Sequence, residues 1–320
     1  MGPLIVIAIA AGAASAFLAA GVAAGSIMAV PLFYLAPLPV MIAGMAFSPW
    51  AALGAAVVAT VGLGLSFGSS FLLAYLLGMG LPAFALSYAA LLAREEKAAR
   101  DGLLWFPLGT LILMTAGFAT LGVVVALLSM ASGYEAYKTI ITTAYEALTT
   151  GEVGRPPLPG DPDPSAMGSL LAHVLPPMAG VMSMVSQLVC LYLAAKAAQV
   201  SGRLNRPWPD ISAFRLPSSA TLFLAAALAL SMAPAMIGLA ASVAAATLIL
   251  AYALAGFALV HALTRGHSAR FLVLSGVWFT SLMLGWPLIA MALLGFVDAM
   301  FDLRTRLSSA QGGPPAANDR

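Results

Sequence analysis

The sequence predicts an all-α fold, a polytopic transmembrane helix bundle of eight or nine spans. Residues 1–93 contain no Lys, Arg, Asp, Glu or His, and Arg94 is the first charged residue. The whole chain is 62% hydrophobic and 8% charged, where soluble domains carry about 25% charged residues. A charge at the centre of a spanning helix costs roughly 2.5–3.5 kcal/mol, which explains why a membrane protein excludes charge over so long a stretch.

The uncharged N-terminal block is long enough for four spans, because a bilayer core needs about 20 apolar residues per helix. We expect these spans at residues 3–24, 28–47, 50–67 and 70–93. Pro31, Pro37 and Pro39 fall in the second span and predict a kinked or partly re-entrant helix. A bilayer tolerates such a helix only where protein or water satisfies the freed backbone groups.

The middle of the chain predicts a fifth span at 103–130, after a polar loop at 94–101. The longest polar segment follows at 131–168. Its first half carries apolar and aromatic residues at helical spacing, which predicts a short helix lying in the membrane interface: Tyr134, Tyr137, Ile141, Tyr145 and Leu148. Its second half is rich in Pro, Gly and Asp and predicts an extended loop.

The C-terminal half begins with a sixth span at 169–197 and a loop at 196–217. Residues 218–263 carry no Lys, Arg, Asp or Glu and can hold two spans broken at Ala233-Pro234. The last apolar run is 271–297. Either it is a short hairpin broken at Gly285-Trp286-Pro287, or one span has to be counted differently. The transmembrane domain therefore covers 1–306, and the small polar tail 307–320 is expected to be disordered.

The distribution of basic residues predicts the orientation of the helices. The loops 94–101 and 196–217 carry three and four Lys or Arg residues and are expected on the cytoplasmic side. The segment 131–168 holds five acidic and two basic residues and is expected in the periplasm. Together with the alanine-rich composition and the absence of a glycosylation sequon, this favours a multi-pass protein of the bacterial inner (plasma) membrane.

Several function classes lack their sequence signals. The net charge of +2 argues against a nucleic-acid partner, and no Walker-type phosphate loop is present. The single cysteine, Cys190, cannot form an internal disulfide, and no Cys/His cluster predicts a metal site. Gly64 to Gly68 match the GxSxG pattern, but they lie in or at the end of an expected span, whereas a nucleophile elbow needs a strand-to-helix turn. We expect no catalytic residue, metal or cofactor, and no enzyme activity.

The candidate ligand-binding residues lie on the sixth span. Ser183, Gln187 and Cys190 follow one another at i, i+4 and i+7, so they form one polar stripe on a helix of Leu, Val, Met and Ala. Gln187 falls near the expected bilayer midplane, where it either bonds another helix or contacts a solute. His173, near the outer end of the same span, is either a gating or pH-sensing residue or a solvated side chain. Asp298 is expected to end the last helix near the headgroups or to pair with a base.

Several apolar motifs carry a resemblance to known families. They are Pro37-Leu38-Pro39-Val40, Trp50-Ala51-Ala52-Leu53-Gly54-Ala55, Leu81-Pro82-Ala83, Arg215-Leu216-Pro217 and Gly295-Phe296-Val297-Asp298. Over residues 1–306 the chain resembles the YybS-like family of predicted bacterial membrane proteins, a family of unknown function. Its first four helices resemble the substrate-binding components of energy-coupling-factor vitamin transporters. That resemblance implies a protein that binds a vitamin or metal ion from outside and depends on a separate ATPase module.

These observations favour an integral membrane protein that binds or transports a small, mostly apolar solute without its own ATPase. The pocket is expected near Gln187 between the second, fourth and sixth spans, with 131–168 as an outer lid. Its expected partners are the lipid bilayer, the solute and a separate membrane or cytoplasmic coupling subunit. The alternative is a structural or assembly scaffold of the cell envelope, acting through Arg203, Arg206, Trp208 and Arg215. A membrane enzyme acting on lipids is a third hypothesis.

Overall fold

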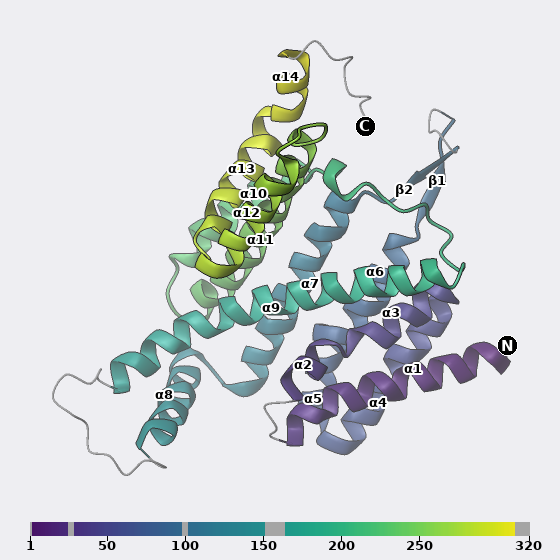
Figure 1. The fold of residues 1–320 in the computed structure, drawn as a ribbon. Coiled ribbons are helices and arrows are strands. Elements are labelled where there is room, and N and C mark those ends of the chain that lie inside the picture. Colours follow the sequence, from purple (N-terminus) through teal and green to yellow (C-terminus); the bar gives the residue numbers. More distant parts are fainter. Residues whose placement is uncertain (1, 25–28, 98–101, 151–163, 311–320) are drawn as a thin grey trace. The chain divides into compact units, whose positions relative to one another are not determined.

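The computed structural model describes residues 2–24, 29–97, 102–150 and 164–310, and its regular structure is almost entirely helical (Figure 1). Seven of the described helices are long and apolar enough to span a membrane: Gly2–Ala20, Ala29–Ala46, Pro49–Phe67, Ser69–Ala90, Leu108–Met130, Ser165–Val200 and Ala235–Leu263. The described part of the structure therefore has fewer helices of full membrane-spanning length than the eight or nine spans predicted from the sequence. The C-terminal apolar runs instead form three helices of 13 to 15 residues. At 1.5 Å per residue these are shorter than the bilayer core of about 30 Å.

The chain forms two compact units. The first consists of Met1–Leu92, Thr115–Asn205 and Ala227–Thr247, and the second of Ala93–Met114, Arg206–Ala226 and Leu248–Arg320. Three helices contribute residues to both units: α7 (Leu108–Met130), α10 (Ser219–Ser231) and α11 (Ala235–Leu263).

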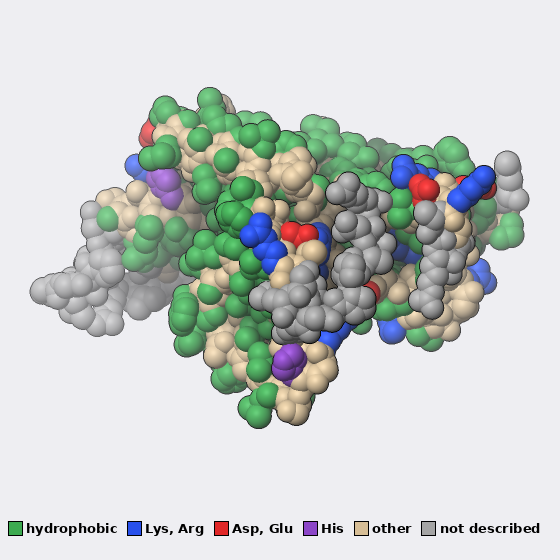
Figure 2. All heavy atoms as spheres, turned by 90° about the horizontal axis from the view of Figure 1, so that it is seen from above, with side chains coloured by type: hydrophobic (Ala, Val, Ile, Leu, Met, Phe, Trp, Pro, Cys, Tyr) green, Lys and Arg blue, Asp and Glu red, His purple; other side chains and the backbone are tan. Residues whose placement is uncertain are grey.

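Hydrophobic side chains occupy much of the protein surface. Leu65 is 85% exposed, Phe17 80% and Trp50 76%. Figure 2 shows a face on which hydrophobic side chains cover wide areas and charged side chains occur in small groups. Soluble monomers rarely expose apolar areas of this extent, whereas lipid-facing helices require them. The exposed surface and the helix lengths together identify a multi-pass membrane protein.

The first unit begins with α1 (Gly2–Ala20) and a short 3-10 turn, η1 (Gly21–Ala24). Helix α1 packs along α4 (Pro49–Phe67) through small residues. A Cβ atom on Gly12 would lie only 2.6 Å from the backbone oxygen of Ala55, so glycine is required for this approach. Close helix contacts through small residues are the usual packing mode in lipid, where no hydrophobic force drives the helices together.

The second and fourth spans are interrupted helices. The second consists of α2 (Ala29–Tyr34) and α3 (Pro37–Ala46). The fourth consists of α5 (Ser69–Tyr75), a π-helical turn η2 (Leu76–Gly80) and α6 (Leu81–Ala90). The kink predicted for the second span is confirmed, since the helix breaks immediately before Pro37. Such interruptions are tolerated in lipid where the freed backbone groups find partners inside the protein.

The remainder of the first unit contains α8 (Tyr134–Thr150) and α9 (Pro164–Val200), which pack against each other. The helix predicted for the first half of 131–168 is confirmed, and Tyr137 buries its side chain beside Ala172 of α9. The extended loop predicted for the second half falls mostly in residues 151–163, outside the described residues. Helix α9 has 37 residues, a length of about 55 Å, and therefore extends well beyond the predicted span of 169–197.

The second unit begins with a hairpin of two short strands, β1 (Ala93–Glu95) and β2 (Leu103–Trp105). They pair antiparallel, with Ala93 opposite Trp105. This hairpin replaces the simple polar loop predicted at 94–101, whose residues 98–101 lie outside the described part. The fifth span consequently starts at Leu108 rather than at 103.

The C-terminal helices of the second unit follow a short 3-10 turn, η3 (Ile211–Ala213). They are α12 (Arg270–Leu284), α13 (Pro287–Phe301) and α14 (Leu303–Ala310). The two predicted breaks are confirmed. Helix α11 starts directly after Ala233-Pro234, and α12 ends at Leu284, directly before Gly285, where φ is +70°. The tail predicted from 307 is helical as far as Ala310, and 311–320 lie outside the described residues.

Candidate functional site

A cavity of about 210 Å³ lies in the first unit beside Gln187. Its walls come from the two interrupted spans, α2–α3 and α5–η2, and from α7 and α9. The apolar lining is largely aromatic, with Phe33, Tyr34, Phe71 and Tyr75. The polar part of the wall belongs to α9 and consists of Ser183, Ser186 and Gln187. The site is therefore an apolar space with hydrogen-bonding groups on one side.

The break between α2 and α3 supplies an unpaired backbone oxygen to this site. Because Pro37 interrupts the helix, the Leu38 amide donates to the carbonyl of Leu35 (3.0 Å) and not to that of Tyr34. The free Tyr34 oxygen then accepts a hydrogen bond from the Ser186 hydroxyl. The Cys190 thiol donates to the same oxygen at 3.5 Å. Two side chains of α9 thus replace the missing helical hydrogen bond.

The π-helical turn η2 supplies a second backbone oxygen that lacks an α-helical donor. In an α-helix the Gly78 carbonyl would accept from residue 82, but residue 82 is proline and has no amide hydrogen. The Gln187 Nε2 atom donates to this Gly78 oxygen at 3.3 Å and to the Ser183 hydroxyl at 3.2 Å. Single π turns inside α-helices are found frequently at functional sites.

Two glycines allow α7 to reach this turn. A Cβ atom on Gly122 would lie 2.7 Å from the Cα atom of Gly78, closer than real Cβ contacts. The two backbones therefore meet without intervening side chains, which is the advantage of glycine at helix crossings in lipid. Both glycines line the cavity.

A buried serine ties the two interrupted spans together. Ser15 of α1 is fully buried, and its hydroxyl donates to the carbonyl of Ala36 at 2.5 Å. The same hydroxyl lies 2.5 Å from the Tyr75 hydroxyl. Ala36 belongs to the α2–α3 break and Tyr75 ends α5, so one side chain fixes the spacing of both cavity walls.

The amide oxygen of Gln187 is the notable polar group of the cavity. Gln187 is 1% exposed, and its Oε1 atom has no hydrogen-bond partner among the described residues. The amide orientation follows from its neighbours, since the Gly78 carbonyl can only accept and therefore requires the Nε2 side. A buried acceptor left unpaired costs about 1–3 kcal/mol. A donor placed in the cavity would remove this cost.

The structure brings together only part of the predicted ligand-binding set. Ser183 and Gln187 line the cavity. Cys190 is buried behind the cavity wall against Tyr34 and is not among the lining residues. His173 is exposed and lies elsewhere on α9, with its Nε2 atom 2.8 Å from the Tyr134 hydroxyl. A contact of Cys190 or His173 with a ligand in this cavity has no support in the geometry.

Sequence reasoning missed the other half of the site. It did not predict the backbone oxygens of Tyr34 and Gly78, which accept hydrogen bonds from α9. It also did not predict Ser186, which lies on the face of α9 next to the predicted stripe. The available signal was Pro37 and Pro82, because Pro37 interrupts the helix shortly after Tyr34 and Pro82 has no amide hydrogen for the Gly78 carbonyl. The stripe at 183, 187 and 190 identified the correct helix but only part of its cavity-facing side.

The geometry gives no catalytic constellation around the GxSxG pattern. Ser66 lies within regular α4, is exposed, and donates to the carbonyl of Gly62 at 2.9 Å. Within the described ranges, no group of three or more His, Cys, Asp or Glu side chains could hold a metal ion.

The arginines of the loop 196–217 make contacts inside their own units. Arg203 lies over the ring of Phe47, with 4.6 Å between its Cζ atom and the ring centroid. In the second unit, Arg206 donates to the Phe106 carbonyl at 3.0 Å, and Arg215 pairs with Asp302 at 2.6 Å. These residues, on which the scaffold hypothesis depends, therefore already have intramolecular roles.

Comparison with known proteins agrees with a membrane protein and supplies no activity. The family model of a predicted membrane protein, DUF2232, matches residues 9–299. No curated protein and no solved structure matches this chain. Since the family model covers most of the sequence, the chain belongs to the DUF2232 family of predicted membrane proteins.

Proposed function

We propose that this protein binds a small, mostly apolar solute in the cavity beside Gln187 and moves it across the membrane without catalysing a reaction. The observation that carries the proposal is the unpartnered Gln187 Oε1 atom in an otherwise aromatic and aliphatic cavity. Ligand sites of this type are mainly apolar and use a few polar groups to orient the ligand.

The size and chemistry of the cavity define the class of solute. An engineered apolar cavity of about 150 Å³ binds benzene, so a volume of about 210 Å³ accommodates a single substituted ring. The aromatic walls favour a planar or alicyclic ring. No Lys, Arg, Asp or Glu lines the cavity, so the solute is uncharged. It carries at least one N–H or O–H group that donates to Gln187.

The interrupted helices favour transport over a purely structural cavity. Many secondary transporters place their substrate between discontinuous helices near the middle of the membrane. Here both interrupted spans face the same cavity. The resemblance to the YybS-like family, and of the N-terminal helices to vitamin-transporter binding components, supports a bacterial inner-membrane protein with a separate coupling subunit.

Thermal unfolding of the purified chain in detergent tests the proposal. A panel of small uncharged ring compounds with and without a hydrogen-bond donor is added, and the change in Tm is measured. We expect a subset of donor-bearing compounds to raise Tm. Gln187→Leu should weaken their binding about tenfold, because the hydrogen bond to the ligand is lost.

A matched control and a second variant make the test specific. Gln199→Leu removes the same amide from an exposed position of the same helix and should leave binding unchanged. Ala179→Leu adds volume to the cavity wall and should reduce binding of every ligand while the protein remains folded. The proposal is wrong if no compound shifts Tm, or if Gln187→Leu and Gln199→Leu bind ligands equally well.

A further inference from the structure

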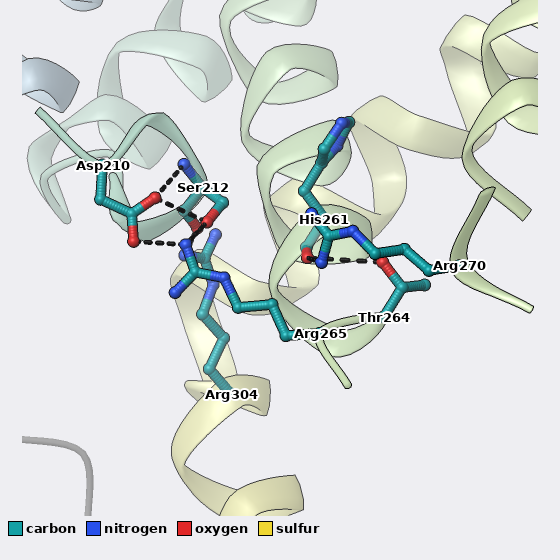
Figure 3. Close-up of polar contacts among 7 residues, drawn as sticks. All are labelled: Asp210, Ser212, His261, Thr264, Arg265, Arg270 and Arg304. Carbon is teal, nitrogen blue, oxygen red and sulfur yellow. Dashed lines mark hydrogen bonds and ion pairs between the residues drawn. The ribbon is translucent and has the colours of Figure 1, made fainter. Parts of the chain in front are cut away.

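The second unit gathers arginine side chains at one end of its helices. Figure 3 shows Arg265, from the loop between α11 and α12, and Arg304 of α14 meeting at the η3 turn, and Arg270, the first residue of α12, reaching the end of α11 at His261. We call Arg265, Arg270 and Arg304 the arginine cluster. All three lie where apolar helices end or begin, which is the level of the lipid headgroups for helices in a membrane.

Arg265 is held at the turn by one carboxylate. It pairs with Asp210 and donates to the Ser212 hydroxyl. Asp210 also caps the turn, accepting from the Ser212 amide at 3.1 Å. The hydrogen bond from Arg265 is the main reason that the pKa of Asp210 lies below its ordinary value. The Arg265 side chain remains 55% exposed, so the pair leaves part of its guanidinium open to a further partner.

Arg304 brings a second guanidinium to the same turn. Its Nε atom donates to Asp298 at 3.0 Å and its Nη1 atom to the Ser212 carbonyl at 2.7 Å. The pairing predicted for Asp298 is thereby confirmed. The Arg304 side chain is only 10% exposed, and its Nη2 atom has no hydrogen-bond partner in the part of the chain that the structure describes. A buried charged donor without a partner is rare and indicates a missing acceptor.

Arg270 has a backbone partner and no carboxylate. Its Nη1 atom donates to the carbonyl of His261 at 3.1 Å, and no acidic side chain of the described ranges forms an ion pair with it. The segments 206–217, 264–270 and 298–306 together contain six arginines and three aspartates, which leaves three positive charges. The aspartates neutralise the cluster only in part.

Apolar side chains continue directly from the cluster. Phe271 and Leu272, which follow Arg270 at the start of α12, are 83% and 76% exposed. Ile211 of the η3 turn is 50% exposed. A soluble anion would make no contact with these apolar side chains, whereas the acyl chains of an amphipathic lipid would cover them. Basic pockets at the ends of membrane helices are a recurrent site for anionic lipid headgroups.

We propose that the arginine cluster binds the phosphate of an anionic phospholipid, with the acyl chains lying along the exposed apolar side of α12. The phosphate oxygens accept from Arg270 and Arg265, and Arg304 contributes its remaining donor. The three arginines come from separate segments, so the bound lipid joins the η3 turn, α12 and α14. This role is independent of the solute cavity in the first unit.

Native mass spectrometry of the full chain in a mild detergent tests the proposal with phosphatidylglycerol as the probe. Arg270→Gln should weaken phosphatidylglycerol binding about fivefold, since each arginine near an anionic headgroup contributes about 1 kcal/mol. Arg94→Gln removes the same charge from β1, where the side chain is 70% exposed, and should have no effect. Arg270 is the preferred position because its change leaves the buried Arg304–Asp298 pair intact.

Two further measurements distinguish a lipid-binding site from a site for soluble anions. Phosphatidylcholine should bind at least fivefold more weakly than phosphatidylglycerol, and inorganic phosphate at millimolar concentration should not displace the lipid. Displacement by phosphate would identify a soluble-anion site and overturn the proposal. Equal losses in Arg270→Gln and Arg94→Gln, or equal binding of both lipids, would overturn it as well. Gln187→Leu should retain full lipid binding, which keeps this result distinct from that of the solute test.

Discussion

Gln187 donates a hydrogen bond to the backbone oxygen of Gly78 at 3.3 Å, so a side chain of one span replaces the hydrogen bond missing from another. The same exchange occurs at Tyr34, whose oxygen accepts from Ser186. Both donors lie on α9, and both acceptors lie at helix interruptions next to prolines. The polar groups of the cavity are thus a consequence of how the broken helices are stabilised. Among the buried side-chain atoms of the described residues that line the cavity, the Gln187 Oε1 atom is the one without a hydrogen-bond partner.

The close approach of α7 and η2 at Gly122 and Gly78 predicts that protein stability falls steeply with the size of the side chain at residue 122. Gly122→Ala places a methyl group 2.7 Å from the Gly78 Cα atom, so the helices must separate. We expect a loss of about 1–3 kcal/mol in stability, the usual cost of overpacking. Gly117→Ala is the matched control on the same helix, because nothing lies within 4 Å of its Cβ position. Equal Tm values for the two variants in detergent would contradict this account of the crossing.

The hydrogen bonds of Ser15 are predicted to stabilise the walls of the same cavity. Ser15→Ala removes the hydrogen bonds to the Ala36 carbonyl and the Tyr75 hydroxyl. We expect a stability loss of roughly 1 kcal/mol, the scale measured for interhelical hydrogen bonds in membranes. Ligand binding should weaken too, because the two cavity walls lose their common tie. Ser66→Ala, an exposed position bonded only to its own helix, should change neither quantity.

The interrupted spans show which features of the fold and the cavity the sequence could predict. Prolines predicted a kinked second span, whose break the structure places before Pro37, and the uncharged stretches predicted the membrane-spanning segments. The stripe on α9 identified Gln187 as a polar group that faces protein. The stripe could not identify Ser186, because the helical repeat alone does not show which of two adjacent helix faces contacts the unpaired carbonyl groups of the interrupted spans. That choice depends on the packing of α2, η2 and α7.

The C-terminal half shows why the predicted count of eight or nine spans is not confirmed by helices of full length. The run 271–297 is apolar throughout, so hydropathy alone cannot distinguish one long helix from two short ones. The sequence offered a break at Gly285-Trp286-Pro287 as one of two alternatives, and the structure has it, since Gly285 adopts a positive φ and Pro287 starts a new helix. Sequence patterns also could not predict the arginine cluster, because Arg304 follows Arg265 and Arg270 by more than 30 residues along the chain.

The buried pair of Asp298 and Arg304 predicts strong energetic coupling. The two side chains are 4% and 10% exposed, and removing one partner leaves the other charge buried. Arg304→Gln should destabilise the protein by about 3–5 kcal/mol. The double variant with Asp298→Asn should lose much less than the sum of the two single losses. Additive losses in this double-mutant cycle, measured by unfolding in detergent, would show that the pair does not interact.

The Asp210–Arg265 contact predicts a pH-dependent contribution to stability. Hydrogen bonds from Arg265 and Ser212 keep the pKa of Asp210 below its ordinary value of 3.8. The unfolded chain therefore takes up this proton at a higher pH than the folded chain. The contribution is complete above about pH 4 and is lost as the pH falls through the lower, folded-state pKa. Wild type should exceed Asp210→Asn in Tm at neutral pH, and the difference should disappear in strong acid. A constant difference would refute the assignment.

The most direct test of the central claim is an experimental structure of the protein purified in lipid, at a resolution that shows bound small molecules. We predict density for a compact, ring-sized molecule in the cavity, with a donor atom within hydrogen-bond distance of Gln187 Oε1. The same map of Gln187→Leu should lack this density. A cavity filled by the protein's own side chains, or a Gln187 amide bonded on both sides to neighbouring helices, would contradict a solute-binding function.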